Sequence, residues 1–251
     1  MAYVPINREA LADKHWRRHA SIAFAKNDTV TPLYVNELAI ALQALPIAFV
    51  QQEDRFSLVV IVGLRPGENL LVSAANTWLS EYLPVSYRSS PFELIPLSGN
   101  ESQYAMCIDE ECITDTDEGE PFFNEAGEIN EDLGKLFELL KQFNAGRQQT
   151  QNICAALAKH NLIVPWPMVL EQDTETLNVN GLYQIDESAL NALSDEAFLD
   201  LKRSHALPVA YAQLLSMHKI SGFGELMRQR AATTKIDKQP ATDTFNFAGL
   251  S

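Results

Sequence analysis

Residues 47–64, IAFVQQEDRFSLVVIVGL, hold two apolar runs on either side of a short polar stretch. The runs, Ile47–Val50 and Phe56–Leu64, are rich in the β-branched and aromatic residues that favour strands. Three further runs of this kind follow between turn residues: Asn69–Ser73, Phe92–Leu97 and Tyr104–Ile108. Because every run is short and bounded by turn residues, the pattern predicts an antiparallel sheet.

One turn in this region has a specific signature. Arg65, Pro66, Gly67 and Glu68 place Pro and Gly at the two central positions of a type II turn, where the Gly supplies a positive φ. We therefore predict a hairpin that joins Phe56–Leu64 to Asn69–Ser73.

A helix is predicted just before the sheet. Thr31 can cap a helix whose first position is Pro32, and leucines then recur at near-helical spacing up to Pro46. These signals predict a helix over Tyr34–Ala44.

The chain after Gly134 has a helical pattern. Apolar residues punctuate a polar segment up to Leu162, and Pro165-Trp166-Pro167 ends it. A short extended pair, Val169-Leu170 with Gly181–Ile185, is expected next. Asp186 and Ser194 then have the character of helix caps, and Pro208 can start a further helix. The predicted fold class is α+β: an antiparallel sheet with an N-terminal helix, followed by a mainly helical C-terminal half.

Charge divides the chain into regions. The formal charge is −14, and thirteen acidic residues without a Lys or Arg lie between Ser89 and Gly134, which leaves the rest near −1. We predict an α+β region at 1–110, an acidic connecting segment at 111–134, a mainly helical region at 135–230 and a flexible tail at 231–251. The regions can also form one composite domain.

Composition excludes several classes of function. An acidic chain lacks the basic surface that nucleic acids require, and it is a poor match for anionic membranes. No apolar run approaches the length of a membrane span, and residues 1–18 show no secretory signal, so we expect a cytoplasmic protein without membrane insertion. Its three cysteines, Cys107, Cys112 and Cys154, are expected as thiols, with a local Cys107–Cys112 disulfide as the alternative.

Motifs for cofactors and metals are missing from the sequence. It contains no Walker loop, no GxSxG and no GxGxxG. Asp115 and Asp117 begin like an EF-hand loop that does not continue, and the two cations between His15 and His19 argue against a zinc pair. We therefore predict no cofactor, no metal and no assigned catalytic residue. His160, His205 and His218 are isolated and typical of surface or capping histidines.

Aromatic and arginine side chains form the best candidate recognition patch. Such side chains dominate binding hot spots, although aromatic clusters also pack inside proteins, and Trp166 between two prolines is equally ambiguous. The candidate partner-binding residues are Trp78, Tyr82, Tyr87, Arg88, Phe92 and Trp166.

Several ordered stretches resemble the SapC family. They include Asn36-Glu37-Leu38, Leu45 to Val50, Gly63 to Leu70, Tyr82-Leu83-Pro84, Gly119 to Phe123 and Gly181 to Glu187. The resemblance covers about residues 3–220 and excludes the tail. One departure is Ser89-Ser90, where relatives often carry a further Arg and an aromatic residue.

The resemblance implies a role without assigned catalytic residues. The family name refers to bacterial surface-layer proteins, and similar proteins occur beside proteins that resemble flavin-dependent tryptophan halogenases and cupins. This implies an accessory protein that recognises a protein or peptide partner without turnover of its own. Two alternatives stay open: an enzyme acting on peptides or amino acids whose groups converge only in the fold, and a structural surface-layer component.

Overall fold

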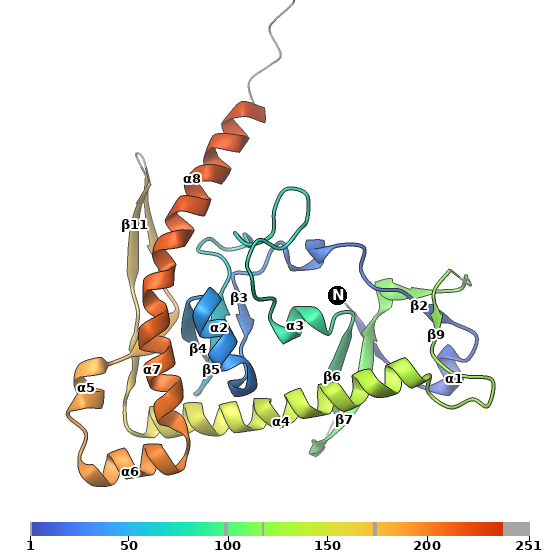
Figure 1. Cartoon of the computed structure of the whole chain (residues 1–251), viewed down its shortest axis with the longest axis horizontal. Coiled ribbons are helices and arrows are strands. Elements are labelled where there is room, and N and C mark those ends of the chain that lie inside the picture. Colours follow the sequence, from blue (N-terminus) through green and yellow to red (C-terminus); the bar gives the residue numbers. More distant parts are fainter. Residues whose placement is uncertain (1, 98–99, 117, 173–174, 238–251) are drawn as a thin grey trace, which may run out of the picture.

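The computed structural model describes residues 2–97, 100–116, 118–172 and 175–237 and has an α+β fold, as predicted (Figure 1). The α-helices are α1 (Arg8–Leu11), α2 (Leu38–Ala44), α3 (Val85–Arg88), α4 (Glu131–Lys159), α5 (Glu187–Asn191), α6 (Asp195–Arg203), α7 (Ala206–Ser216) and α8 (Ile220–Asp237). The 3-10 helices are η1 (Ile22–Ala25), η2 (Val35–Glu37), η3 (Glu110–Cys112) and η4 (Met217–Lys219).

The strands form four antiparallel groups. The largest sheet has the order β10 (Ile163–Pro165), β13 (Leu182–Ile185), β4 (Ile47–Gln52), β5 (Arg55–Ile61) and β3 (Val30–Pro32). A second sheet has the order β1 (Tyr3–Pro5), β7 (Asn100–Asp109) and β6 (Phe92–Leu97). The smaller groups are β8 (Ile113–Thr114), β2 (His15–Trp16) and β9 (Glu120–Pro121), and the ribbon of β11 (Met168–Gln172) with β12 (Glu175–Val179).

The central hairpin follows the sequence pattern. β4 and β5 pair in a register that sets Phe49 opposite Leu58 and Ile47 opposite Val60. All four side chains are buried, because both faces of this part of the sheet are covered. Strand β13 pairs with β4, so elements from both halves of the chain share one sheet.

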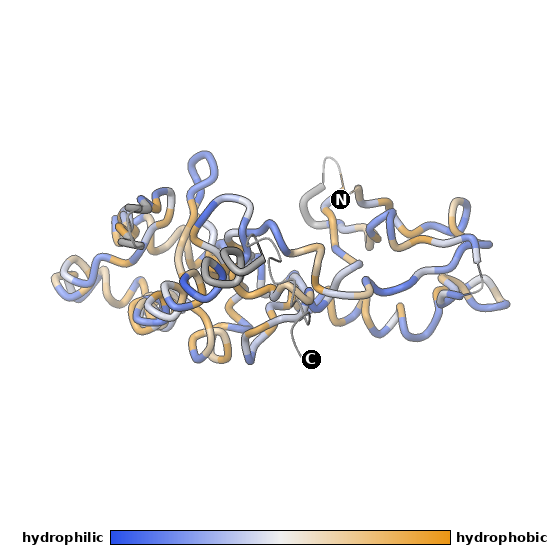
Figure 2. Tube along the Cα trace, turned by 90° about the horizontal axis from the view of Figure 1, so that it is seen from above, coloured by the Kyte–Doolittle hydropathy of each residue, from blue (hydrophilic) through white to orange (hydrophobic). Residues whose placement is uncertain are grey.

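Helix α4 runs along the molecule and contributes to two hydrophobic cores (Figure 1). Its C-terminal part places Ile153 and Leu157 in the large core, which α7 and the five-stranded sheet complete. Its N-terminal part places Leu133 in the small core, beside the β1-β7-β6 sheet and Trp16. Seen from above, the molecule is elongated along the same axis (Figure 2).

The predicted helix cap at Thr31 is wrong. Thr31 and Pro32 belong to β3, which pairs with Val60 and Val59 of β5, and helical structure begins only at Val35. The Thr31 hydroxyl instead lies 2.7 Å from the Ser86 hydroxyl. Pairing with a distant strand therefore outweighs the local capping signal.

The predicted hairpin forms its turn and one bond beyond it, from Leu70 N–H to the Val62 carbonyl at 2.8 Å. Gly67 has a φ of +75° and Glu68 N–H donates to the Arg65 carbonyl at 3.1 Å, as a turn requires. Asn69–Ser73 is not a strand, because the Asn69 side chain accepts from Leu71 N–H and donates to the Ala25 carbonyl. These bonds turn the chain away from the ladder.

Other predictions have mixed outcomes. Asp186 and Ser194 cap α5 and α6, as predicted. Both segments of the predicted extended pair are strands, in β11 and β13, but they do not pair with each other, since β11 pairs with β12 and β13 lies between β10 and β4.

Order also extends into two regions for which we predicted little. Segment 111–134 holds β8 and β9, which flank β2, and it buries Phe122 completely. Helix α8 continues to Asp237, so it reaches into the predicted tail. Residues 238–251 of that tail lie outside the described part. No helix in the described part is long and apolar enough to span a bilayer.

Candidate functional site

A cavity of about 180 Å³ is lined by residues of α4, α3 and β6, together with Tyr3 of β1 and the segment around Tyr34. We call it the junction cleft. The aromatic and charged side chains that line it come from β1, the residue before η2, β6 and α4: Tyr3, Tyr34, Phe92, Glu93, Phe143 and Arg147. Leu94 and Leu140 add apolar surface, while hydroxyl and amide groups come from Ser86, Ser89 and Asn144.

Local packing explains why α4 approaches the chain around Tyr34. Gly146 faces Asn36, and a Cβ atom at this position would collide with the Asn36 side chain. One turn later the Thr150 hydroxyl accepts from Val35 N–H at 2.8 Å and donates to the Gly146 carbonyl at 2.7 Å. This close approach brings Tyr34 and Arg147 to the same cleft.

Glu37 fixes the short helix α3 beside the cleft. The carboxylate is only 3% exposed, and Oε1 accepts from the Tyr82 hydroxyl, from Val85 N–H at 2.8 Å and from the Arg88 guanidinium at 3.2 Å. Burial raises the pKa of Glu37, and these three donors oppose the rise. Burial and the Glu37 carboxylate raise the pKa of Tyr82. The Glu37 contacts therefore position one wall of the cleft.

A second pair, between buried Tyr87 and half-buried Asp28, holds the other side of α3. The Tyr87 hydroxyl donates to Asp28 Oδ2 at 2.9 Å, while the ring makes edge contacts with Trp78 and Phe24. Burial raises the pKa of Asp28, opposed by the Tyr87 hydrogen bond. The Arg88 guanidinium lies 5.9 Å from the centre of the Phe143 ring and so covers a cleft residue.

The predicted aromatic patch therefore divides. Tyr82, Tyr87, Phe92 and Trp166 are buried, so these four do not form an exposed recognition surface. Trp78 is half-buried and donates its indole N–H to the Tyr82 carbonyl at 2.9 Å.

Three of the six residues act around the cleft. Phe92 lines it, and Tyr82 and Arg88 anchor α3. Trp166 lies elsewhere, after β10, where its backbone N–H donates to the Leu182 carbonyl.

Glu93 and Arg147 give the cleft its polarity. Glu93 is accessible as a residue, yet the surrounding protein raises the pKa of its carboxyl group, and the Arg147 charge opposes this rise. Burial raises the pKa of Tyr34, and Arg147 again opposes it. At Tyr3, burial together with Glu93, Asp109 and Cys112 raises the pKa to about 12. Glu93 thus acts on both Tyr3 and Tyr34, whereas Arg147 acts on Tyr34 and on Glu93 itself.

The sequence reasoning missed Tyr34, Glu37, Glu93 and Arg147. Each is a common residue type with no motif spacing to the others, and only the fold joins positions 34, 93 and 147. A weak signal existed at Glu37, a charged residue among the apolar residues of a predicted helix.

A thiol, an imidazole and a carboxylate also meet near the small core. Cys112 Sγ lies 3.4 Å from His19 Nδ1, and His19 Nε2 lies 3.7 Å from Asp109 Oδ2. Cys112 is 3% exposed, and burial, then Asp109, raises its pKa to about 11. A nucleophilic cysteine requires the opposite shift and an accessible sulfur, so this arrangement holds a neutral thiol.

Metal and disulfide chemistry can be assessed in the described residues. Cys107, Cys112 and Cys154 are free and buried, as predicted for thiols. Among the described residues, no three His, Cys, Asp or Glu side chains gather in a way that could hold a metal ion. Asp117 of the EF-hand-like stretch lies outside the described residues.

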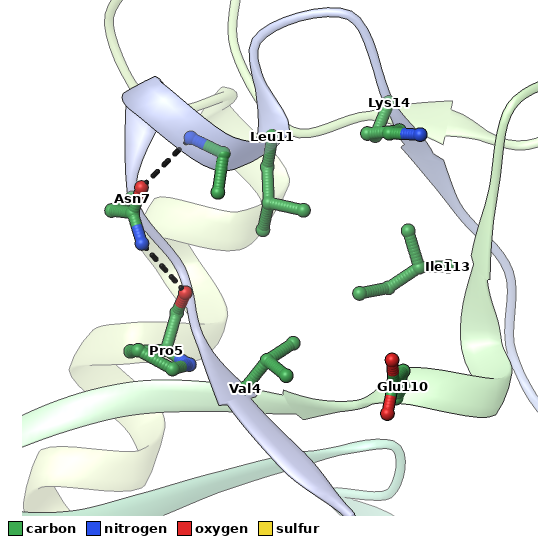
Figure 3. A pocket seen from close by; sticks show the side chains of 8 residues that line it. Val4, Pro5, Asn7, Leu11, Lys14, Glu110 and Ile113 are labelled. Carbon is green, nitrogen blue, oxygen red and sulfur yellow. Dashed lines mark hydrogen bonds between the residues drawn. The ribbon is translucent and has the colours of Figure 1, made fainter.

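A larger hollow of about 470 Å³ lies at the N-terminal end (Figure 3). Val4, Leu11 and Ile113 point toward it, and Lys14 and Glu110 bring charges to its side (Figure 3). Lys14 is already paired with Asp115. The junction cleft, with an acid, an arginine and several aromatic rings, is the better candidate despite its smaller volume.

Comparisons with known proteins identify a family. No curated protein and no solved structure matches the chain. A family model described as SapC matches residues 6–223, which include every residue of the junction cleft except Tyr3. Since this match covers most of the sequence, the chain belongs to the SapC family.

Proposed function

We propose that this chain is a non-catalytic binding protein that recognises a protein or peptide partner, and that the junction cleft receives one side chain of that partner. The observation that carries the proposal is the cleft itself. Its volume of about 180 Å³ is below the roughly 300–1,000 Å³ usual for small-molecule sites, and it suits a single side chain.

The walls of the cleft match this role. Aromatic rings supply contact area at low entropic cost, and Arg147, Glu93 and the neighbouring hydroxyl and amide groups supply directional bonds. The α3 wall is held by the buried Glu37 and Asp28 contacts, so little order has to be gained on binding.

The enzymatic alternative has less support. The Cys112–His19–Asp109 cluster is the closest arrangement to a reactive group among the described residues, and it keeps its thiol neutral and buried. A binding role needs none of these groups.

Peptide display provides the test. A random peptide library is selected on the full chain, and the enriched peptides are titrated against Asn144→Trp, which fills the cleft. Gln149→Trp, an exposed position on the same helix, is the matched control. We expect Asn144→Trp to lose binding and Gln149→Trp to retain it. No enrichment, or equal binding to both variants, would refute the proposal.

A further inference from the structure

The charges around the junction cleft point to a specific kind of partner side chain. Resting on the proposed function, we propose that the cleft takes a cationic side chain, Lys or Arg, from a basic segment of the partner, with its cation between Glu93 and the Tyr3 ring. The polarity of the cleft, its aromatic walls and the negative charge of the surrounding segment all favour a bound cation.

The Glu93 carboxylate can accept a bond from a bound cation. In the described part of the chain its carboxylate makes no hydrogen bond and no ion pair within 4 Å, although Arg147 influences it from across the cleft. The pKa of Glu93 remains raised despite Arg147, so a further positive charge beside Glu93 would stabilise its ionised form.

The aromatic walls add to this preference. The half-buried Tyr3, Tyr34 and Phe143 line the cleft, and the face of an aromatic ring attracts a cation. The molecule already makes such a contact at the cleft edge, where the Arg88 guanidinium lies over Phe143. An aliphatic Lys or Arg stem can also pack against Leu94 and Leu140.

The negative charge of the segment around Glu93 also favours a cationic partner side chain. Glu93 belongs to the segment between Ser89 and Gly134, which carries thirteen acidic residues and no Lys or Arg. Within that segment Asp109 also raises the pKa of Tyr3 in the cleft. A basic partner would be steered toward the part of the molecule that holds this segment, and the rate of association would fall as salt is added.

Substitution of Arg147 provides a second test, because it should change the affinity in the direction opposite to that of a Glu93 substitution. Its charge repels a bound cation, whereas Gln at this position would keep an N–H donor for a backbone carbonyl of the partner. We therefore expect Glu93→Gln and Arg147→Gln to change the affinity for a basic peptide in opposite directions. A carboxylate-bearing ligand would reverse both signs.

The experiment titrates the full chain with fluorescein-labelled decalysine, decaglutamate and an uncharged Gly-Ser peptide of equal length. For decalysine, we expect Glu93→Gln to weaken binding about tenfold and Arg147→Gln to tighten it about threefold. Glu125→Gln and Lys141→Gln remove the same charges at exposed positions outside the cleft and should each change the affinity less than about twofold.

The outcomes distinguish a failure of the cation assignment from a failure of the proposed function. Equal effects of Glu93→Gln and Glu125→Gln, or tighter binding of decaglutamate than of decalysine, would overturn the cation assignment. The proposed function would still stand if display-selected peptides continued to lose binding to Asn144→Trp. If decalysine binds Asn144→Trp as well as the unmodified chain, its attraction is diffuse and the cleft assignment is wrong.

Discussion

The two cores along α4 differ in how they treat buried polar groups. In the large core, buried Gln213 accepts from Ile185 N–H at 2.9 Å and donates to the Ile47 carbonyl at 3.3 Å, while Ser216 accepts from Ile47 N–H. In the small core, Trp16 Nε1 is buried with no hydrogen-bond partner in the described residues, and Asp109 Oδ2 has only the His19 imidazole, at 3.7 Å. Glu37 Oε2 and Gln184 Oε1, at the edge of the large core, also lack a hydrogen-bond partner among the described residues.

This difference bears on the stability of each core. A buried polar group without a partner costs about 1–3 kcal/mol. We therefore expect the large core, where Gln213 and Ser216 satisfy buried backbone groups of Ile47 and Ile185, to open less easily than the small core. The junction cleft has one wall from each, because β6 belongs to the small-core sheet and α3 is anchored by Glu37 of η2.

Large-to-small substitutions that create a cavity in each core provide the strongest test of the comparison. Ile153→Ala and Leu133→Ala each remove a fully buried side chain from α4, so we expect each to lower the free energy of unfolding locally by about 2–5 kcal/mol. Hydrogen exchange should accelerate throughout the chain for Ile153→Ala and mainly in the small-core strands for Leu133→Ala. Leu139→Ala, at an exposed position of the same helix, should stay within about 0.5 kcal/mol. Equal acceleration in β4 and β5 for both core variants would show one indivisible core.

Removal of the polar network of the large core should have the next largest effect. Gln213→Met keeps the side-chain volume similar but leaves Ile185 N–H and the Ile47 carbonyl without their side-chain partner. We expect a loss of about 1–3 kcal/mol for each group, measured by urea unfolding. Gln148→Met, at an exposed position of α4, is the control. A neutral result would mean that this network does not distinguish the cores.

The buried Glu37 carboxylate predicts a pH dependence at the cleft wall. Because its pKa is raised in the folded chain, its contribution to stability is full below the unfolded-state pKa and is lost as pH rises through the folded-state pKa. The stability of the unmodified chain relative to Glu37→Gln should therefore increase as pH falls from neutral toward the unfolded-state value. Urea unfolding at a series of pH values measures this. A relative stability that decreases toward acid would contradict the assignment.

Thiol labelling should show the smallest difference between the two cores. Burial raises the pKa of Cys154 in the large core to about 12, and burial and Asp109 raise that of Cys112 in the small core to about 11. We expect both to react with Ellman's reagent far more slowly than in urea, and Cys112 to react before Cys154. The single Cys→Ser variants assign each signal. Faster labelling of Cys154 would reverse the order of stability of the two cores.

Local signals in the sequence predicted much of the fold. The β4–β5 runs, the Gly67 turn and the caps at Asp186 and Ser194 all depend on residues close in the chain. The failures involve distant partners: Thr31 pairs with β5, and β13 inserts beside β4. No local pattern encodes either contact.

The candidate site was less accessible to sequence reasoning. Aromatic and arginine content correctly drew attention to the region of Arg88 and Phe92, but it did not separate the buried anchors from the groups that face the cleft. Arg147 reaches the cleft only because the small Gly146 lets Asn36 approach α4. That dependence on close packing cannot be read from spacing.

The uninterrupted course of α4 has a consequence for signalling. Its 29 residues extend about 43 Å at 1.5 Å per residue, and Arg147 lies near the middle. A partner side chain bound beside Arg147 would restrain bending of α4, so motions at the two ends of the helix, about 43 Å apart by the same rise per residue, would become correlated without any hinge. Binding of a partner in the junction cleft would then be detectable as smaller fluctuations at both ends of α4.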